Sequence, residues 1–346
     1  MENLSTKNSI DNEYDDHTVK EVVIAFDTSN YTTSVAVVDM EGRVLSDKRR
    51  LLFVKSEERG LRQSDALFQH VKNLPELVEL AMAEVGAVEV KIVAASSRPR
   101  RVEGSYMPVF LAGEGMARSI AASYSLPLEI FSHQEGHIAA ARININEFSD
   151  KSLQGLAFHL SGGTGEILLT KGHIPVKIVG GTRDISFGQL LDRIGTALGM
   201  KFPSGAEMDR IATINKSCIN YHYSRSGNII IEDGILPLIK VDNGFVNLSG
   251  IESAGQRIIN KGRTDTTKLI TELFFCVGDA LKNMILNAAE ITGTDNVTLA
   301  GGVAASEFLK DYLTKTIAPD ILKIYFSEPR YSVDNAVGIA LLAIDR

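Results

Sequence analysis

Residues 21–50 read EVVIAFDTSNYTTSVAVVDMEGRVLSDKRR. Val22–Phe26 is a continuous apolar run, which predicts a buried strand. The polar residues that follow predict a turn, and Ser34–Asp39 predicts the returning strand. A Glu-Gly hairpin turn then leads to Val44–Arg50, which predicts a third strand. We therefore expect an antiparallel β-meander near the start of the chain.

The same pattern recurs in residues 155–171, which read GLAFHLSGGTGEILLTK. Gly155–Leu160 and Glu166–Lys171 predict two strands joined by a glycine-rich turn. An α/β chain that carries this device twice indicates the two-lobed actin-like ATPase fold, which actin, Hsp70 and the sugar kinases share. Each meander of that fold supplies a phosphate turn. The alternative is a pair of unrelated hairpins in an ordinary α/β protein.

The rest of the chain alternates between helical and strand patterns. Helical periodicity predicts helices over residues 64–85, 108–124, 188–199, 205–215, 252–260, 265–292 and 335–344. Short apolar runs predict further strands at Val90–Ala95, Glu129–Phe131, Asn296–Leu299 and Ile324–Phe326.

With 346 residues, the chain exceeds what one hydrophobic core usually supports, so we expect two lobes. The polar residues 1–20 predict a disordered tail. Residues 21–154, joined by the C-terminal helix at about 335–346, would form the N-terminal lobe. Residues 155–334 would form the C-terminal lobe.

Composition narrows the class of protein. The chain has no apolar run long enough for a membrane span and no apolar segment typical of a secretory signal. Its two cysteines, Cys218 and Cys276, are too few for a disulfide framework, so we expect a cytoplasmic protein. The net charge of −7 is unusual for a nucleic-acid binder. A nucleic acid would therefore need a local basic patch.

His133 and His137 are four residues apart in SHQEGHIAAAR, a segment that predicts a helix with a capping box from Ser132 to Glu135. On a helix this spacing places both imidazoles on one face, as two ligands of one metal ion require. The alternative is a pair of surface histidines. A metalloprotease would need its general-base glutamate directly after the first histidine, where Gln134 stands, so the spacing disfavours an endopeptidase.

Three further segments could hold a nucleotide or metal, and each has a simpler structural alternative. The Ser161–Gly165 turn could bind an anion through its backbone, or be a tight hairpin. Leu299–Ser306 enters a helix through Gly301 and Gly302, where a nucleotide could lie against backbone, or it could be a tight connection. Asp334 precedes the last helix, where it could be a metal ligand or an N-cap.

Together and in this order, six segments resemble the glycoprotease family, the family of tRNA threonylcarbamoyladenosine synthases. They are FDTSNYTTSVAV (26–37), SHQEGHIAAA (132–141), LSGGTGEILL (160–169), FGQLLDRIGTALGMKFPSGAEMDRIA (187–212), LAGGVAAS (299–306) and RYSVDNAVGIA (330–340). The resemblance runs from about residue 21 to the end of the chain.

The resemblance implies an actin-like fold and transfer of a threonylcarbamoyl group from its adenylate to a tRNA adenosine beside the anticodon, an EC 2.3.1.- acyltransferase activity. It implies one divalent metal, iron or zinc, held by His133, His137 and Asp334. It also implies an adenine nucleotide, either ATP, ADP or threonylcarbamoyl-AMP. The implied nucleotide contacts are Thr28, Ser29, Ser161, Gly162, Gly163, Asp192, Gly205, Glu207, Gly301, Gly302 and Ser306.

The chain also departs from the family pattern. Thr164 stands where the family has a histidine, Ser306 where it has an asparagine, and Asn30-Tyr31 where it has a Cys-Asp pair. A loop with few glycines, residues 96–110, replaces the family's glycine-proline-glycine loop. These changes predict a divergent paralogue with altered walls around the substrate.

That loop carries Arg98, Arg100 and Arg101. Arginine binds phosphate or carboxylate through two parallel hydrogen bonds, so we expect at least one of the three to point into the cleft and bind an anion. The alternative is that all three face solvent.

Three functions remain open. The first is a carbamoyltransferase with tRNA as its partner. The second is a small-molecule kinase that would depend on Asp27 and the phosphate turns but leaves both histidines unexplained. The third is a non-catalytic dimerisation partner of a paralogue or of a second copy, which would have no use for a metal site.

Overall fold

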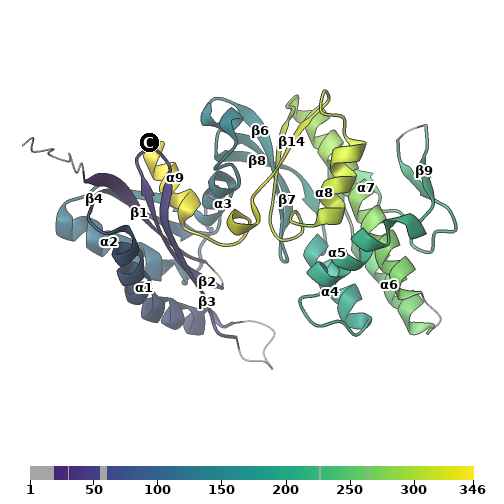
Figure 1. Cartoon of the computed structure of the whole chain (residues 1–346), viewed down its shortest axis with the longest axis horizontal. Helices are drawn as coiled ribbons and strands as arrows, with labels where there is room; N and C mark the ends of the chain where they lie inside the picture. The colour runs from purple at the N-terminus through teal and green to yellow at the C-terminus, as the bar shows by residue number, and fades with distance from the viewer. Residues whose placement is uncertain (1–18, 30, 55–60, 226, 263–264) are drawn as a thin grey trace, which may run out of the picture.

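The computed structural model describes residues 19–29, 31–54, 61–225, 227–262 and 265–346. Two β-sheets stand side by side with helices on their outer faces and between them (Figure 1). The predicted tail at 1–20 lies outside the described residues up to residue 18, whereas Lys20 already belongs to the first strand. The predicted lobe boundaries at residues 154 and 334 stay a prediction.

The first sheet contains the first meander and two parallel strands. Its order is β3 (Val44–Leu51), β2 (Thr32–Asp39), β1 (Lys20–Thr28), β4 (Val88–Arg98) and β5 (Leu128–Ser132). Strands β1, β2 and β3 pair antiparallel, and β4 runs parallel to both β1 and β5. The meander predicted for residues 22–50 is therefore confirmed.

The second sheet repeats this arrangement. Its order is β11 (Val241–Asp242), β12 (Phe245–Val246), β8 (Ile174–Thr182), β7 (Gly165–Lys171), β6 (Gln154–Leu160), β13 (Asn296–Ala300) and β14 (Lys323–Phe326). The run β8-β7-β6-β13-β14 has the strand directions of β3-β2-β1-β4-β5, namely an antiparallel meander followed by two parallel strands. The duplicated unit therefore contains five strands, whereas the sequence pattern shows only the strand–turn–strand part of each copy.

Helices cover both faces of the first sheet. They are α1 (Gln63–Val85) and α2 (Phe110–Tyr124) on one face and α3 (His133–Ala141) and α9 (Val337–Ile344) on the other. This double cover explains the continuous apolar run of β1. Its residues Val22, Ile24 and Phe26 face α1 and α2, whereas Val23 and Ala25 face α9.

The second sheet packs against a larger group of helices around a single core. These helices are α4 (Phe187–Ala197), α5 (Gly205–Ile214), α6 (Ser249–Asn260), α7 (Thr266–Thr292) and α8 (Glu307–Thr316). Short 3₁₀ turns at Asn146–Ser149, Lys216–Cys218 and Pro329–Tyr331 and a hairpin of β9 (Tyr221–Tyr223) and β10 (Ile229–Ile231) complete the structure.

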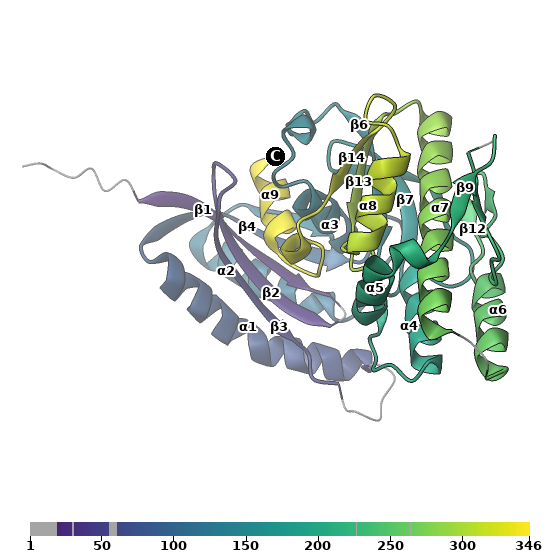
Figure 2. The ribbon, with the colours of Figure 1, turned by 45° about the vertical axis from the view of Figure 1, so that its right-hand side comes forward.

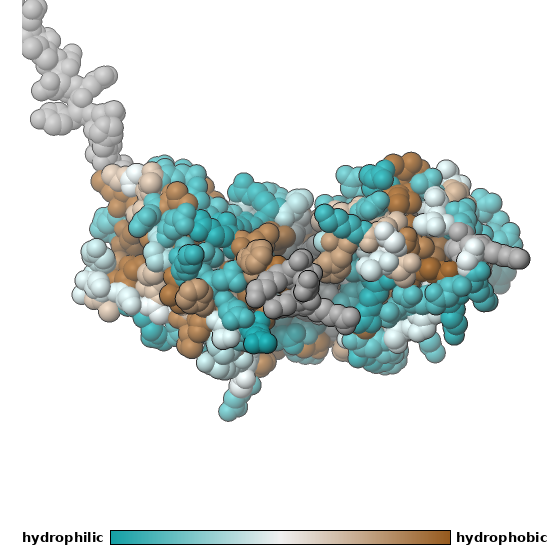
Figure 3. Space-filling view, turned by 90° about the horizontal axis from the view of Figure 1, so that it is seen from below, coloured by the Kyte–Doolittle hydropathy of each residue, from teal (hydrophilic) through white to brown (hydrophobic). Residues whose placement is uncertain are grey.

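The C-terminal helix α9 returns to the first sheet, and α3 lies between the two sheets (Figure 2). The face shown in Figure 3 is mainly hydrophilic, with smaller hydrophobic areas between. Among the described residues, no helix has both the length and the apolar character that a membrane crossing requires.

Candidate metal centre and cleft

Helix α3 carries His133 and His137 and begins with the predicted capping box. The Ser132 hydroxyl accepts a hydrogen bond from the Glu135 backbone N–H, and the Glu135 carboxylate accepts from the backbone N–H of Ser132. These two bonds satisfy backbone donors that the first turn of a helix leaves unpaired. The start of α3 is therefore fixed, and with it the position of His133.

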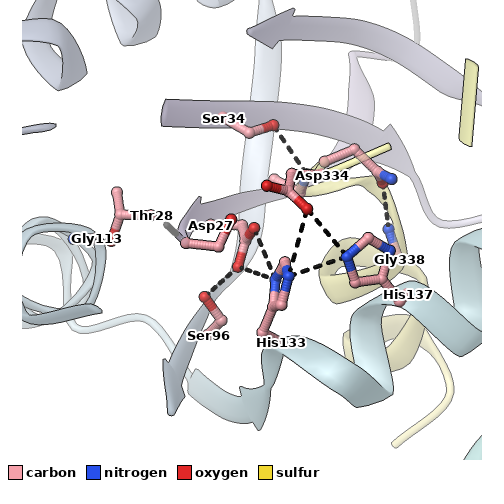
Figure 4. A network of polar contacts seen from close by, with 12 residues as sticks. Asp27, Thr28, Ser34, Ser96, Gly113, His133, His137, Asp334 and Gly338 are labelled. Atoms are coloured by element: carbon pink, nitrogen blue, oxygen red, sulfur yellow. Dashed lines mark hydrogen bonds and ion pairs between the residues drawn. The ribbon is translucent and has the colours of Figure 1, made fainter. Parts of the chain in front are cut away.

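Asp334 reaches the two histidines from the loop before α9. The hydroxyl oxygen of Ser34 on β2 accepts a hydrogen bond of 2.8 Å from the Ala336 N–H, which ties this loop to the first sheet. Asn335 accepts a bond from the Gly338 N–H, and Asp334 caps no helix. The N-cap alternative for Asp334 is therefore wrong, because the carboxylate points away from α9 and toward α3 (Figure 4).

Close contact between α3 and α9 brings the three side chains together. A Cβ added to Gly338 would lie 1.8 Å from the carbonyl oxygen of Gly136, so only glycine permits this approach. Nε2 of His137 then lies 2.9 Å from Nε2 of His133 and 3.1 Å from Oδ1 of Asp334. The His133 Nε2 to Asp334 Oδ1 distance is 3.5 Å.

These separations fit a metal ion. Nitrogen and oxygen ligands bind zinc at about 2.0–2.2 Å, so at bond angles of 90–110° neighbouring ligand atoms lie about 2.8–3.6 Å apart. The three distances fall in this range, and the nitrogens and the carboxylate suit iron or zinc. Two imidazoles and one carboxylate would leave coordination positions open.

Asp27 orients the first histidine from behind. Its fully buried carboxylate lies 3.0 Å from Nδ1 of His133 and accepts a hydrogen bond from the hydroxyl of Ser96. A partner at Nδ1 directs Nε2 of His133 toward His137 and Asp334, as in many metal sites. Burial lowers the pKa of His133, but Asp27 and Asp334 outweigh it and raise that pKa to about 10.

The histidines act on Asp334 in return. Burial would raise the pKa of this carboxyl, but hydrogen bonds and charge from His133 and His137 hold it well below its usual range. Asp334 is therefore ionised over the physiological pH range and available as a ligand.

His159 is a third imidazole at this centre, and none of the sequence motifs indicates it as a site residue. It lies on β6, two residues before the glycine turn, and its ring centroid is 5.0 Å from that of His137. Burial, followed by the neighbouring histidines, lowers the pKa of His159 to about 3. It is therefore a neutral imidazole on the side of the cleft that the second sheet provides.

Two cavities lie next to each other along the cleft. The first, about 590 Å³, is lined by the three converging residues, His159, Arg100, Ser29 and the turn from Ser161 to Thr164. The second, about 340 Å³, is lined by Asp192, Gly205, Asp209 and Ser306 among others. Gly162 and Gly302 line both cavities, so the glycine turns mark the boundary between a metal side and a second compartment.

The predicted nucleotide residues divide into two groups. Those that line one of the cavities are Ser29, Ser161, Gly162, Gly163, Asp192, Gly205, Gly302 and Ser306. Thr28 is fully buried against α2, where its hydroxyl donates to the Val109 carbonyl and accepts from the Gly113 N–H. Gly301 packs against the backbone of Leu160, and Glu207 lies in the first turn of α5 outside the lining of both cavities.

Asp209 is a further cleft residue that is not among the predicted site residues. Its carboxylate accepts hydrogen bonds from the backbone N–H groups of Glu307 and Phe308 and from the Ser306 hydroxyl. It thereby fixes the N-terminus of α8 at the wall of the second compartment. The only sign of this role in the sequence is that Asp209 lies in the same segment as Gly205.

The three loop arginines have different surroundings. Arg100 lines the metal-side cavity and pairs with Glu166, whereas Arg101 pairs with Glu135 and is outside the cavity lining. The half-buried Arg98 has an Nε that lacks a hydrogen-bond partner among the described residues. Of the three, Arg100 is the one that faces the cleft.

A further group of cations, Lys48, Arg49 and Arg50 on β3, offers less to an anion. Lys48 pairs with Glu84 and Arg50 with Glu76, both on α1, and Arg49 pairs with Asp47 on its own strand. These cations are already neutralised by neighbouring carboxylates, so the cluster is a solvated, ion-paired surface.

Solved structures with the same architecture confirm the fold. Full-length HypF in its phosphate- and nucleotide-bound form matches with a TM-score of 0.56 at 12% identity, over 94% of this chain and 56% of that one. Component A of the (R)-2-hydroxyglutaryl-CoA dehydratase of Acidaminococcus fermentans matches with a TM-score of 0.52 at 11% identity, over 95% and 98%. The chain has the actin-like ATPase fold that the duplicated meanders predicted.

Sequence comparison is more specific. The chain is 27% identical over 333 residues to the tRNA N6-adenosine threonylcarbamoyltransferase of Neorickettsia sennetsu (strain ATCC VR-367 / Miyayama), covering 94% of this chain and 93% of that protein. It is 30% identical over 331 residues to that of Streptococcus pneumoniae (strain ATCC 700669 / Spain 23F-1), covering 93% and 91%. The family profile described as TsaD, tRNA N6-adenosine threonylcarbamoyltransferase, matches residues 54–341. The chain therefore belongs to the TsaD family, as its six motifs indicated.

Proposed function

We propose that this protein is a metal-dependent threonylcarbamoyltransferase that acts on tRNA, or a carbamoyl transferase closely related to it. The observation that carries the proposal is the convergence of His133, His137 and Asp334 at a cavity that shares Gly162 and Gly302 with a second compartment. A ligand with a nucleoside at one end and an acyl group at the other needs two such adjacent compartments.

The second compartment suits the adenosine part of an acyl-adenylate. Asp192 accepts a hydrogen bond of 2.8 Å from the Ser204 N–H through Oδ1, which holds the carboxylate at the cavity wall. A carboxylate fixed in this way can accept hydrogen bonds from ribose hydroxyls. Gly162 and Gly302 would let backbone N–H groups approach the phosphate closely.

The metal side suits the group that is transferred. His133, His137 and Asp334 would hold the ion, and the buried Asp27 would keep the first of these ligands in its binding tautomer. When bound, the ion would supply Lewis-acid polarisation of the carbamoyl carbonyl. His159 and Gln134 line the same wall and would exclude water from the group while tRNA delivers its adenosine amine.

The environment of Asp27 disfavours the kinase alternative. A small-molecule kinase would need Asp27 free to accept a proton or to face phosphate and Mg²⁺. In this chain Asp27 is fully buried and engaged by His133 and Ser96. An endopeptidase is equally disfavoured, because both oxygens of the Glu135 carboxylate are engaged, by Ser132 and by Arg101.

The test is to compare the parent with His137→Ala in metal content and in threonylcarbamoyl transfer. We expect His137→Ala to lose most of its bound metal and at least about a hundredfold of its transfer rate, since a metal site that loses one of three protein ligands is open to solvent and weak. Transfer is measured by mass spectrometry of nucleosides from unmodified tRNA incubated with the protein and threonylcarbamoyl-adenylate.

His222→Ala provides the matched control, because His222 is an exposed histidine on β9. It should leave both metal content and transfer unchanged. A parent that binds metal but modifies no tRNA under these conditions would contradict the transferase proposal. A His137→Ala protein with unchanged metal content would contradict the ligand assignment.

A further inference from the structure

Four polar side chains from the two sides of the cleft meet beside the candidate metal ligands. Nη2 of Arg100 lies 2.8 Å from Oε1 of Glu166, and Nε2 of Gln134 donates a bond of 3.4 Å to the other carboxylate oxygen. His159 and Glu166 are directly opposite each other on β6 and β7, so their side chains share one face of the sheet.

The loop that carries Arg100 is held over the metal helix. The Gln134 N–H donates a 3.0 Å bond to the Pro99 carbonyl, and the Arg100 N–H donates a 3.0 Å bond to the Ser105 hydroxyl. Pro99 restricts the backbone further. The backbone of Arg100 is therefore held beside the cavity wall by its own loop, independently of Glu166.

The position of Arg100 along the cleft tells which part of a ligand it would meet. The glycine turns separate the two cavities, and the candidate metal ligands lie on the far side of these turns from the second compartment. Arg100, Gln134 and His159 line the metal-side cavity and are absent from the lining of the other one. A ligand that fills both cavities would place its nucleoside far from Arg100 and its acyl end close to it.

The chemistry of Arg100 fits a carboxylate at that end. Guanidinium binds carboxylate through two parallel hydrogen bonds and stays charged at every relevant pH. The arginine side chain is 43% exposed and the Glu166 side chain 17%, so solvent reaches the guanidinium and weakens the pair. Glu166 thus already presents to Arg100 the kind of group that a ligand carboxylate would replace.

We propose that Arg100 is a specificity-determining residue that binds the carboxylate of the amino-acid part of the transferred group. Glu166 occupies this carboxylate position while the cleft is empty and yields it to the ligand. This inference rests on the proposed function, because it takes the transferred group to be an amino-acid carbamoyl.

The experiment measures the affinities of two probes by calorimetry. One is a non-hydrolysable sulfamoyl analogue of threonylcarbamoyl-adenylate with a free threonine carboxylate, and the other is its methyl ester. AMP serves as a third probe that contacts the nucleoside compartment alone. We expect the parent to bind the acid about ten- to a hundredfold more tightly than the ester, as a charge-assisted bond requires.

Two substitutions should act in opposite directions. Arg100→Ala should reduce the preference for the acid to within about twofold, because the charge partner is gone. Glu166→Gln should raise affinity for the acid about three- to tenfold, because a competing and repelling carboxylate is removed. Both variants should bind AMP as the parent does. Arg118→Ala is the matched control, since Arg118 pairs with Glu114 on the surface of α2.

The opposite effects of the two substitutions on affinity for the acid distinguish ligand recognition from a purely structural ion pair. If the Arg100–Glu166 pair only holds the two sides together, both substitutions will weaken every probe alike, and the inference is overturned. Equal loss of AMP affinity in Arg100→Ala would show that Arg100 binds phosphate, which also overturns it. A parent that binds none of the three probes would instead contradict the proposed function.

Discussion

At the scale of single residues, the contact of Asp27 with His133 determines the role of Asp27. The carboxylate has no contact with solvent, and its partners are Nδ1 of His133 and the hydroxyl of Ser96. A buried carboxylate in this position stabilises the tautomer of His133 that can bind metal through Nε2, and it increases the basicity of the imidazole. Its role would be to support the ligand set from behind.

Asp27→Asn should keep the shape of this contact but remove its charge. We expect zinc affinity to fall about ten- to a hundredfold, because outer partners of metal-binding histidines contribute this much. Competition with a chromophoric chelator measures the change.

Asp39→Asn is the control for losing a buried carboxylate from the same sheet, since Asp39 pairs with Arg43 at the far end of β2. It should leave zinc affinity unchanged. Equal zinc affinity in Asp27→Asn and the parent would refute the supporting role of Asp27.

At the scale of elements, the capping box of α3 links local helix stability to the metal centre. The helix has only nine residues and carries both histidines, so disorder in its first turn displaces His133. Ser132→Ala should lower the free energy of unfolding by about 1 kcal/mol, the usual contribution of an N-cap. It should also weaken zinc binding, which the fall in thermal stabilisation by added zinc measures.

Helix α4 provides a control of the same kind. It begins with a second capping box from Ser186 to Gln189 and carries none of the three candidate ligands. Ser186→Ala should lower the free energy of unfolding by a similar amount, about 1 kcal/mol, and leave zinc affinity unchanged. If both substitutions weaken zinc binding alike, the effect is general destabilisation and the specific link to α3 is wrong.

At the scale of the whole molecule, Arg142 at the end of α3 connects the helix to the second sheet. Its buried guanidinium donates hydrogen bonds to the carbonyls of Gly172 and Leu156 and to the hydroxyl of Thr298. Burial lowers the pKa of this guanidinium to about 9. Burial and then the charge of Arg142 lower the pKa of His173 to about 4.

This depressed pKa predicts acid sensitivity. The unfolded chain binds a proton at His173 below pH of about 6.5, whereas the folded chain binds it only near pH 4, so stability falls as the pH drops through this window. His173→Gln should remove about 1–3 kcal/mol of the stability lost between pH 7.5 and 4.5. Urea unfolding at both pH values measures it.

His222→Gln removes an exposed histidine and should leave this pH dependence as it is in the parent. A His173→Gln protein with the full acid loss would show that other groups cause it, such as the buried His159, whose pKa is also lowered.

The sequence by itself determined the parts of this protein that depend on neighbouring residues. Two meanders follow from alternating apolar runs and turns, and the i, i+4 spacing and capping box of α3 follow from one turn of helix. The short strands β9 to β12 carry too few residues for a periodic signal. Thr28 is predicted at a phosphate turn because neighbouring residues define that turn. The packing of Thr28 against α2 involves residues far away in the sequence, so the sequence does not reveal it.

Only the tertiary structure decided which distant residues meet. Asp334 lies 197 positions from His137, and Asp27 lies 106 positions from His133. These contacts depend on the close approach of α3 and α9 at Gly136 and Gly338, and on the pairing of β1 with β4. No local pattern encodes such distances, because hydrophobic packing brings the elements together without regard to their separation in sequence.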